Sequence, residues 1–241
     1  MTTTAPLIAL TDVTLRRSGR AILSGIDLTA DDRRIGIVGR NGSGKTTLAR
    51  ILSGLVPADD GSVRIAGVDV ARDRRAAIAT VGILFQNPDH QIIFPTVQEE
   101  LAFGLTQMGQ DRAQVDGRVA AILAAFGKSH WADAATHHLS QGQKQLLCLM
   151  AVMAMAPRLV ILDEPFSGLD LVTRLQLARY LDGIDAAVVH VTHDPEVLRH
   201  YDRVLWMDDG RIVADGAAVE VLDAYIVAMT TRGAGDDLSD L

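Results

Sequence analysis

One glycine-rich segment constrains the fold of this chain more than any other feature of its sequence. The segment has the pattern G-x-x-x-x-G-K-[ST], follows the apolar run RIGIVG (Arg34–Gly39) and precedes a run with helical apolar spacing, TTLARILSGL. A strand, a glycine loop and a helix start in this order surround a phosphate with backbone N–H groups and the positive end of a helix. We expect Lys45 to reach the β- and γ-phosphates of a nucleotide and Thr46 to bind Mg²⁺. The candidate ATP-binding residues are Gly39, Arg40, Asn41, Gly42, Ser43, Gly44, Lys45, Thr46 and Thr47.

A second apolar run ends in two carboxylates. The run LVILD (Leu159–Asp163) reads as a buried strand, and Glu164 follows it directly. In a chain with a phosphate-binding glycine loop, or P-loop, this is the Walker B arrangement: Asp163 would hold Mg²⁺ through water, and Glu164 would polarise the attacking water as a general base. Adjacent carboxylates at a strand end are as often structural as functional, so this prediction depends on the P-loop.

The rest of the chain predicts an α/β fold. The period-two runs LIALTDVTL and AILSGIDLTA predict an antiparallel β region near the N-terminus. Further apolar strands at Ala186–Thr192 and Arg203–Met207 alternate with helical stretches, which is typical of a parallel sheet covered on both faces. No strand-like run occurs between about Asn87 and Ala156, so we expect a helical subdomain inserted there. The predicted boundaries are a core of residues 1–86 and 157–228, a helical subdomain of 87–156 and a disordered tail of 229–241.

Charge and composition exclude several classes of function and partner. A formal net charge of -7 argues against nucleic acid as a partner, because phosphate neutralisation needs clustered Lys and Arg. The single cysteine, Cys148, lies in the apolar run LLCLMAVMAM and is predicted to be a buried thiol. No run approaches the roughly 18 to 20 apolar residues that would cross a bilayer, and the start MTTTAPLIAL lacks a secretory signal. We therefore expect the chain to stay in the cytosol.

The segment LSQGQKQ (Leu139–Gln145) lies about twenty residues before the carboxylate pair and opens a long helical run. Ser140 suits an N-cap, so the segment alone reads as an ordinary capped helix. Because the segment follows the P-loop and precedes the Walker B carboxylates, it resembles the signature motif of ABC ATPases, with Gln141 where glycine is usual. The resemblance extends to about Ala228 and implies an ABC ATPase domain over 1–228 with a RecA-like P-loop NTPase core. The residues that it places against the ATP of a partner subunit are Ser140, Gln141, Gly142 and Gln143.

The resemblance assigns three further residues. Gln86 resembles the Q-loop glutamine that touches Mg²⁺ and the attacking water, Asp170 the D-loop aspartate, and His193 the switch histidine at the γ-phosphate. A lone His at a strand end is more often structural, so the role of His193 rests on the order of the motifs. The implied cofactors are ATP and Mg²⁺. The resemblance implies that catalysis depends on Glu164, His193 and Gln86. It also implies that Mg²⁺ is held by Thr46, Gln86 and Asp163.

One departure concerns the base of the nucleotide. The family usually places an aromatic residue near the N-terminus against adenine, but the matching stretch here is LRRSG (Leu15–Gly19). Arg16 or Arg17 can stack on a base through the guanidinium group, or both can be solvated surface charges. The sequence leaves these two readings open, and with them the base selectivity.

The stretch after Gln86 is richer than a general Q-loop. QNPDHQIIFPTVQEELAFG resembles the ATPase subunits of energy-coupling factor (ECF) importers for vitamins and metal ions, most closely the biotin-specific branch. In that family a short helix beginning near the second glutamine, here Gln91, helps form the groove where the membrane transmitter subunit docks. Four apolar residues belong either to such a docking surface or to the ordinary core: Ile92, Ile93, Phe94 and Val97.

The resemblance implies a peripheral ATPase at the cytoplasmic face of the cell membrane. Its partners would be a second copy or a related ATPase, a membrane transmitter subunit and a substrate-binding membrane subunit. Because every motif is present in this one chain, a homodimer with two equivalent sites is favoured. The ATPase of another importer, for cobalt or nickel, or of an exporter is the alternative, since its catalytic motifs would be the same.

Overall fold

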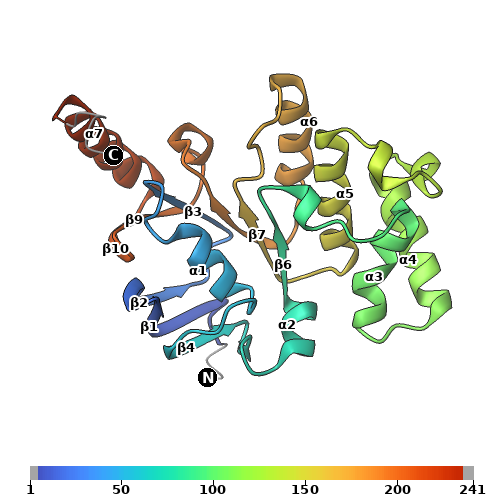
Figure 1. Cartoon of the computed structure of the whole chain (residues 1–241), viewed down its shortest axis with the longest axis horizontal. Helices are drawn as coiled ribbons and strands as arrows, with labels where there is room; N and C mark the ends of the chain where they lie inside the picture. The colour runs from blue at the N-terminus through green and yellow to red at the C-terminus, as the bar shows by residue number, and fades with distance from the viewer. Residues whose placement is uncertain (1–4, 236–241) are drawn as a thin grey trace.

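Two β-sheets pack around a shared apolar core in the computed structural model, which describes residues 5–235 (Figure 1). The first sheet is antiparallel, with the order β2-β1-β4-β5. The second has the order β10-β9-β3-β8-β7-β6 and is parallel except at β10. The strands are β1 Ile8–Arg17, β2 Arg20–Ala30, β3 Arg34–Gly39, β4 Asp60–Ile65, β5 Val68–Asp69, β6 Val81–Leu84, β7 Leu159–Asp163, β8 Ala187–Val191, β9 Arg203–Asp208 and β10 Arg211–Gly216. The predicted α/β fold with an antiparallel N-terminal region is confirmed.

The helices cover the two faces of the second sheet. They are α1 Lys45–Leu52, α2 Arg74–Thr80, α3 Val97–Gln107, α4 Arg112–Ala125, α5 Gln141–Ala154, α6 Leu171–Asp182 and α7 Ala218–Gly235, with 3₁₀ turns η1 Pro88–His90, η2 Ser129–Trp131, η3 Thr136–His138 and η4 Pro195–Leu198. Alternate residues of β7 face opposite sides, as strand geometry requires. Ile161 packs with α1 and the first sheet, whereas Leu162 packs with α3, α4 and α5. Figure 1 shows these three helices gathered on one side of the molecule and the antiparallel sheet on the other.

The segment between β6 and β7 contains helices and loops. Within the described residues, its only β contact is one isolated bridge between Thr96 and Ala135. The cluster that holds α3, α4 and α5 together also includes Leu84 of β6 and Leu162 of β7. The helices are therefore packed onto the sheet at the strands that precede the predicted catalytic loops. Cys148 of α5 is buried in this cluster, as predicted.

The C-terminal helix α7 is longer than the composition suggested. It continues to Gly235, so the predicted tail is wrong for residues 229–235, while residues 236–241 lie outside the described part of the chain. The hydroxyls of Thr230 and Thr231 donate to carbonyls one turn earlier, and Arg232 forms an ion pair with Asp208 at 3.0 Å. This tertiary contact holds a segment whose glycines disfavour a helix. None of the helices in residues 5–235 combines the length and the apolarity that a membrane crossing needs.

Candidate active site

The predicted phosphate-binding and catalytic residues meet at one edge of the parallel sheet. The strands β3, β8 and β7 are neighbours, and their carboxyl ends lie at this edge, so the loops that follow them converge. A cavity of about 780 Å³ lies there. It is lined by Ile22, Gly39, Arg40, Asn41, Gly42, Gly44, Lys45, Thr46, Thr47, Gln86, Glu164, His193 and Tyr225. The structure therefore brings Gln86, Glu164 and His193 together with the P-loop.

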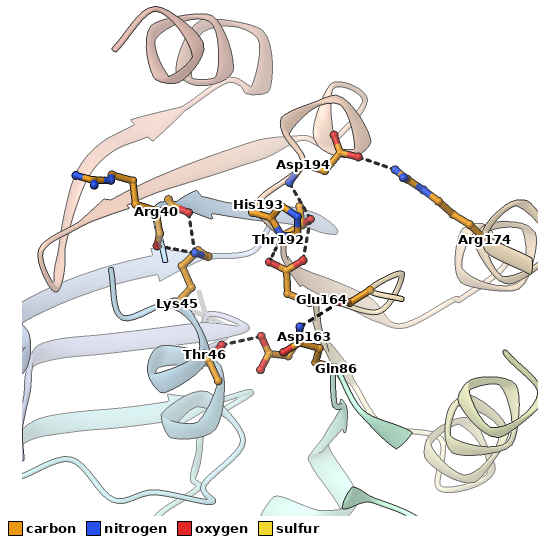
Figure 2. A network of polar contacts seen from close by, with 12 residues as sticks. Arg40, Lys45, Thr46, Gln86, Asp163, Glu164, Arg174, Thr192, His193 and Asp194 are labelled. Atoms are coloured by element: carbon orange, nitrogen blue, oxygen red, sulfur yellow. Dashed lines mark hydrogen bonds and ion pairs between the residues drawn. The ribbon is translucent and has the colours of Figure 1, made fainter. Parts of the chain in front are cut away.

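The P-loop curls around the ammonium group of Lys45 (Figure 2). Lys45 Nζ donates to the carbonyl oxygens of Gly39, at 2.7 Å, and of Arg40, at 2.9 Å. Burial lowers the pKa of Lys45, and the nearby carboxylates of Glu164 and Asp163 oppose this effect. The amine is thus held by oxygen acceptors inside the loop, where phosphate oxygens would be equivalent partners.

Two glycines allow the close packing of this loop. A Cβ on Gly39 would collide with the carbonyl oxygen of Met207 in β9 and would lie 2.6 Å from Ser43 Oγ. Gly44 has φ 101°, and a Cβ there would lie 2.7 Å from Leu23 Cδ2. Both positions therefore need glycine for steric reasons. The Ser43 hydroxyl is buried without a hydrogen-bond partner among the described residues, which fits a site built for an anion.

Thr46 and Asp163 bring two oxygen ligands together beside the P-loop. Thr46 Oγ1 donates to Asp163 Oδ1 at 3.0 Å. Burial raises the pKa of Asp163, and the hydrogen bond from Thr46 opposes the rise. Within residues 5–235, no group of three or more His, Cys, Asp or Glu side chains could hold a metal ion by itself. The pair fits Mg²⁺, which prefers oxygen ligands and usually takes one or two protein groups together with waters and substrate phosphates.

The Glu164 carboxylate is held from two sides (Figure 2). Its Oε1 lies 2.8 Å from Nδ1 of His193, and its Oε2 accepts from Thr192 Oγ1 at 3.3 Å. The backbone of Glu164 has φ 51°, and its N–H donates to the carbonyl of Val191 at 2.9 Å. A positive φ is uncommon for a residue other than glycine and costs on the order of 1 kcal/mol. The chain thus turns sharply after β7 and presents a fixed proton acceptor to the cavity.

Gln86 contacts the loop that follows β7, and Asp170 lies at the end of this loop. Gln86 Nε2 donates to Ser167 Oγ at 3.1 Å, which links the loop after β6 to the Walker B loop. Asp170 is the N-cap of α6: it accepts from the backbone N–H of Thr173 at 3.0 Å and from its hydroxyl at 2.7 Å. The hydrogen bonds from Thr173 lower the pKa of Asp170. Asp170 lies outside the 780 Å³ cavity, unlike Gln86.

The signature residues also lie outside this cavity. Ser140 caps α5 in a reciprocal pair with Gln143, whose Oε1 accepts the Ser140 N–H at 2.8 Å. A Cβ on Gly142 would collide with Thr173, so α5 begins in close contact with α6. Ser140, Gly142 and Gln143 line a second cavity of about 660 Å³, and Gln141 is exposed beside them. Within one chain, the signature and the P-loop therefore belong to different cavities.

The two arginines considered for base stacking are not brought to the P-loop cavity. Arg16 Nη1 lies 2.9 Å from Asp60 Oδ2, and Arg17 Nη1 lies 3.9 Å from Asp59 Oδ1. Both arginine side chains are more than half exposed, at 57% and 53%. These contacts favour the reading as solvated surface charges, and base stacking by arginine stays a prediction.

Two residues that line the cavity were missed by the sequence analysis, Ile22 in β2 and Tyr225 in α7. Neither belongs to a motif. Their positions depend on how β2 and α7 pack against the P-loop, because both elements are far from it along the chain or in another sheet. No local pattern in the sequence signals such a contact.

An apolar groove lies beside the segment after Gln86. A cavity of about 380 Å³ is bounded by the end of α1, α2, β6, α3 and α5 and includes Ile93 and Phe103 in its lining. Ile93 is 67% exposed, whereas Val97 is fully buried. Ile92 and Phe94 are half-buried. The four apolar residues of this stretch are thus divided between the core and the surface.

The short helix expected near Gln91 is wrong. The helical turn η1 covers Pro88–His90 and ends before Gln91. Gln91 Oε1 accepts the backbone N–H of Phe85, and buried Glu100 accepts the N–H groups of Ile93 and Phe94, each at 2.9 Å. Because Glu100 already satisfies these donors, the segment stays non-helical until α3 begins.

Comparisons with known proteins decide the family. The ABC transporter family matches residues 23–167. This chain belongs to the ABC transporter ATPases. A biotin transport ATP-binding protein, BioM, of Rhodobacter capsulatus is 54% identical over 217 residues, which cover 90% of this chain and 93% of that protein. A protein of the same name from Rhizobium etli is 40% identical over 206 residues, 86% of this chain and 92% of its own length.

Solved structures of ABC ATPases share the fold. The structure of cbiO1 from Clostridium perfringens, described as part of the ABC transporter complex cbiONQ, matches with a TM-score of 0.78 and 27% identity over 95% of both chains. A dimeric ATP-binding cassette bound to ADP and phosphate matches with a TM-score of 0.75 and 24% identity, over 88% of this chain and 98% of that one. The predicted family, fold and assignment as an ATP hydrolase are confirmed.

Proposed function

We propose that this ABC ATPase energises an ECF-type importer for biotin, as a peripheral subunit at the cytoplasmic face of the membrane. The observation that carries the substrate assignment is the 54% identity, over 90% of this chain, to a protein named for biotin transport. The similarity to cbiO1, part of a transporter complex, supports the importer type. The apolar groove next to the Gln86 loop supplies a surface for the membrane partner.

The reaction would be hydrolysis of ATP by water at the γ-phosphate. The water oxygen attacks phosphorus, its proton passes to Glu164, and the bond to the β–γ bridging oxygen breaks to give ADP and phosphate. Lys45 would exchange the loop carbonyls for β- and γ-phosphate oxygens. His193 and Gln86 would contact the γ-phosphate and the attacking water. Mg²⁺ held by Thr46, by Gln86 and, through water, by Asp163 would neutralise charge on the phosphates.

Two subunits would complete two sites. The exposed N-terminus of α5, with Ser140 and Gln143, would face the nucleotide on the P-loop of a second copy, where the helix dipole favours an anion. The loop with Asp170 would lie at the contact between the subunits. The separation of signature and P-loop cavities within one chain supports this arrangement. ATP would close the dimer and hydrolysis would open it.

The membrane transmitter subunit would dock at the groove with Ile93 and Phe103. Gln86 connects this groove to the active site, because it is hydrogen-bonded to Ser167 in the Walker B loop and precedes the groove segment in sequence. A partner held there would respond to changes at the γ-phosphate, as coupling through a shared two-state element requires.

Purification from membranes in a gentle detergent tests the proposal. The expected result is co-purification with a small substrate-binding membrane protein and a transmitter protein, and ATP-driven uptake of labelled biotin by the complex in vesicles. The same complex carrying Glu164→Gln should assemble but not transport. Isolation with a single large transmembrane protein that expels its substrate would show that the importer assignment is wrong. Uptake of another solute in place of biotin would show that the substrate assignment is wrong.

A further inference from the structure

An ion pair joins helix α6 to the loop after β8, outside the P-loop cavity (Figure 2). Nη2 of Arg174, in the first turn of α6, donates to Oδ2 of Asp194 at 2.7 Å. The two side chains are 39% and 34% exposed, so water partly screens the pair. Ion pairs of this kind add little to the stability of a fold. The place of the pair therefore matters more than its strength, because Asp194 directly follows His193.

The guanidinium group of Arg174 is also held by an aromatic ring. Its Cζ lies 5.5 Å from the centroid of the Phe166 ring, within the range of a cation–π contact. Phe166 lies in the loop that follows Glu164, and its ring packs edge-on against that of His190 in β8, with centroids 5.7 Å apart. The planar group is thus fixed between this ring and the Asp194 carboxylate, which favours a single rotamer of Arg174.

A chain of hydrogen bonds leads from Asp194 to Glu164 (Figure 2). The backbone N–H of Asp194 donates to Thr192 Oγ1 at 3.1 Å, and this hydroxyl donates to Glu164 Oε2 at 3.3 Å. His193 lies between the two and contacts the other carboxylate oxygen of Glu164. Thr192 is buried, but the His193 side chain is mostly exposed, so packing alone does not fix its ring. The backbone on both sides of His193 is held instead, at Thr192 and at Asp194.

We propose that Arg174 is a positioning residue for hydrolysis. Its ion pair with Asp194 holds residues 192–194, so that His193 and Glu164 keep their orientation toward the γ-phosphate and the attacking water. This inference rests on the proposed roles of these two residues. Neither member of the pair lines the P-loop cavity, so ATP still binds when the pair is lost. A catalytic group displaced by about 1 Å, however, slows turnover by about tenfold to a hundredfold.

The test uses the full-length chain with Arg174→Met, which removes the charge and keeps a flexible apolar side chain against Phe166. Steady-state ATPase assays give kcat and KM, and calorimetric titration with Mg²⁺ and the non-hydrolysable analogue AMP-PNP gives the affinity. The expected result is a kcat lower by at least about tenfold, with KM and AMP-PNP affinity within about twofold of the wild type. The melting temperature should stay close to wild type, because a partly exposed ion pair adds little stability. Arg174→Lys keeps the cation and should restore most of the lost kcat.

A second variant shows whether Arg174 acts through Asp194. In Asp194→Asn the negative charge is lost, but the amide oxygen is able to replace Asp194 Oδ1, which accepts the N–H of Glu196 at 3.1 Å and caps η4. This variant should lower kcat as much as Arg174→Met does. The double variant should be no slower than either single variant, because both changes remove the same contact.

Arg199→Met is the matched control. The Arg199 side chain is 40% exposed and forms ion pairs with Glu196 and Asp223, and none of the three lines the P-loop cavity. The change thus removes an ion-paired arginine of equal exposure that has no link to Glu164. Its kcat should equal that of the wild type.

Each other result overturns the inference. An unchanged kcat in Arg174→Met would leave the ion pair as a surface contact only. A low melting temperature, or a loss of AMP-PNP binding that matches the loss of kcat, would show a role in folding or in binding. Additive losses in the double variant would mean that Arg174 does not act through Asp194. Glu164→Gln tests the proposed function separately: turnover that survives in it contradicts the catalytic role of Glu164, whereas turnover lost in it but kept in Arg174→Met contradicts this inference alone.

Discussion

The imidazole Nδ1 of His193 lies 2.8 Å from Oε1 of Glu164, so the two side chains form one hydrogen-bonded unit. Glu164 is mostly buried, with 14% of its side chain exposed, whereas His193 is 65% exposed. The histidine can therefore reach outward to a phosphate while it keeps the carboxylate in one orientation. A change in either residue is expected to alter the position of the other.

Glu164→Gln should retain ATP binding and lose hydrolysis by several powers of ten. The P-loop is unchanged in this variant, but an amide does not accept the proton of the attacking water. The variant should also form a stable dimer with ATP. Phosphate release and gel filtration measure the two effects. The control is Glu196→Gln, which makes the same chemical change at an exposed residue paired with Arg199. Near-normal turnover of Glu164→Gln would remove the residue from its proposed role.

GTP should compete with ATP within about tenfold, a difference of roughly 1.4 kcal/mol. The reason is that no aromatic residue of β1 lines the cavity, and the two arginines at the expected position pair with Asp59 and Asp60. Competition binding measures the preference, and a much larger preference for ATP would mean that another residue reads adenine. Arg16→Ala and Arg17→Ala distinguish the two readings: unchanged affinity indicates surface charges, and a loss indicates stacking.

Ile93→Asn should abolish co-purification with the membrane partners and leave the melting temperature and basal ATPase activity of the isolated subunit close to wild type. Ile93 is 67% exposed, so the change removes docking surface and little core. Val97→Asn is the matched control, since Val97 is fully buried and its change should lower the free energy of unfolding by about 2 to 5 kcal/mol. Low melting temperature or intact partner binding in Ile93→Asn would contradict the docking assignment.

The free energy of unfolding should fall with decreasing pH below about 6.5, because of His190. Burial, with smaller effects from His200 and Arg174, lowers the pKa of this histidine to about 3. Between pH 6.5 and about 3, His190 binds a proton in the unfolded chain but not in the folded chain. The free energy of unfolding therefore decreases by roughly 1.4 kcal/mol per pH unit as the pH falls through this range.

Urea unfolding between pH 7 and 4.5 measures this dependence. His190→Asn should reduce the slope by about that amount, since asparagine does not titrate. His200→Asn, a change at an exposed histidine, should keep most of the slope. An unchanged slope in His190→Asn would show that other groups cause the acid sensitivity.

The strands that carry the motifs could be predicted with their bounds. β3 and β7 begin and end at the predicted residues, because each is a continuous apolar run followed by a glycine or by carboxylates. The strand β6, with only the four residues of Val81–Leu84, was not recognised, since so short a run does not differ from a helical segment.

The parts of the site made by tertiary packing could not be predicted. The motifs indicated Gln86, Glu164 and His193, and the structure places them in one cavity. Tyr225 reaches the same cavity because α7 packs on β9, and the part of α7 past residue 229 contacts the second sheet through the ion pair of Arg232 with Asp208. A glycine-containing, polar sequence gives no local sign of such a contact.

The left-handed backbone conformation of Glu164 lowers the stability of the fold, whereas the proposed hydrolysis needs the carboxylate at this position. Glycine and asparagine adopt this conformation with less strain, by on the order of 1 kcal/mol. In a library randomised at this position and sorted only for heat resistance, these two residues should therefore be enriched over the parent. In a library sorted for growth on the transported nutrient they should be lost, and the difference between the two enrichments would give the selective cost of keeping a carboxylate at this turn.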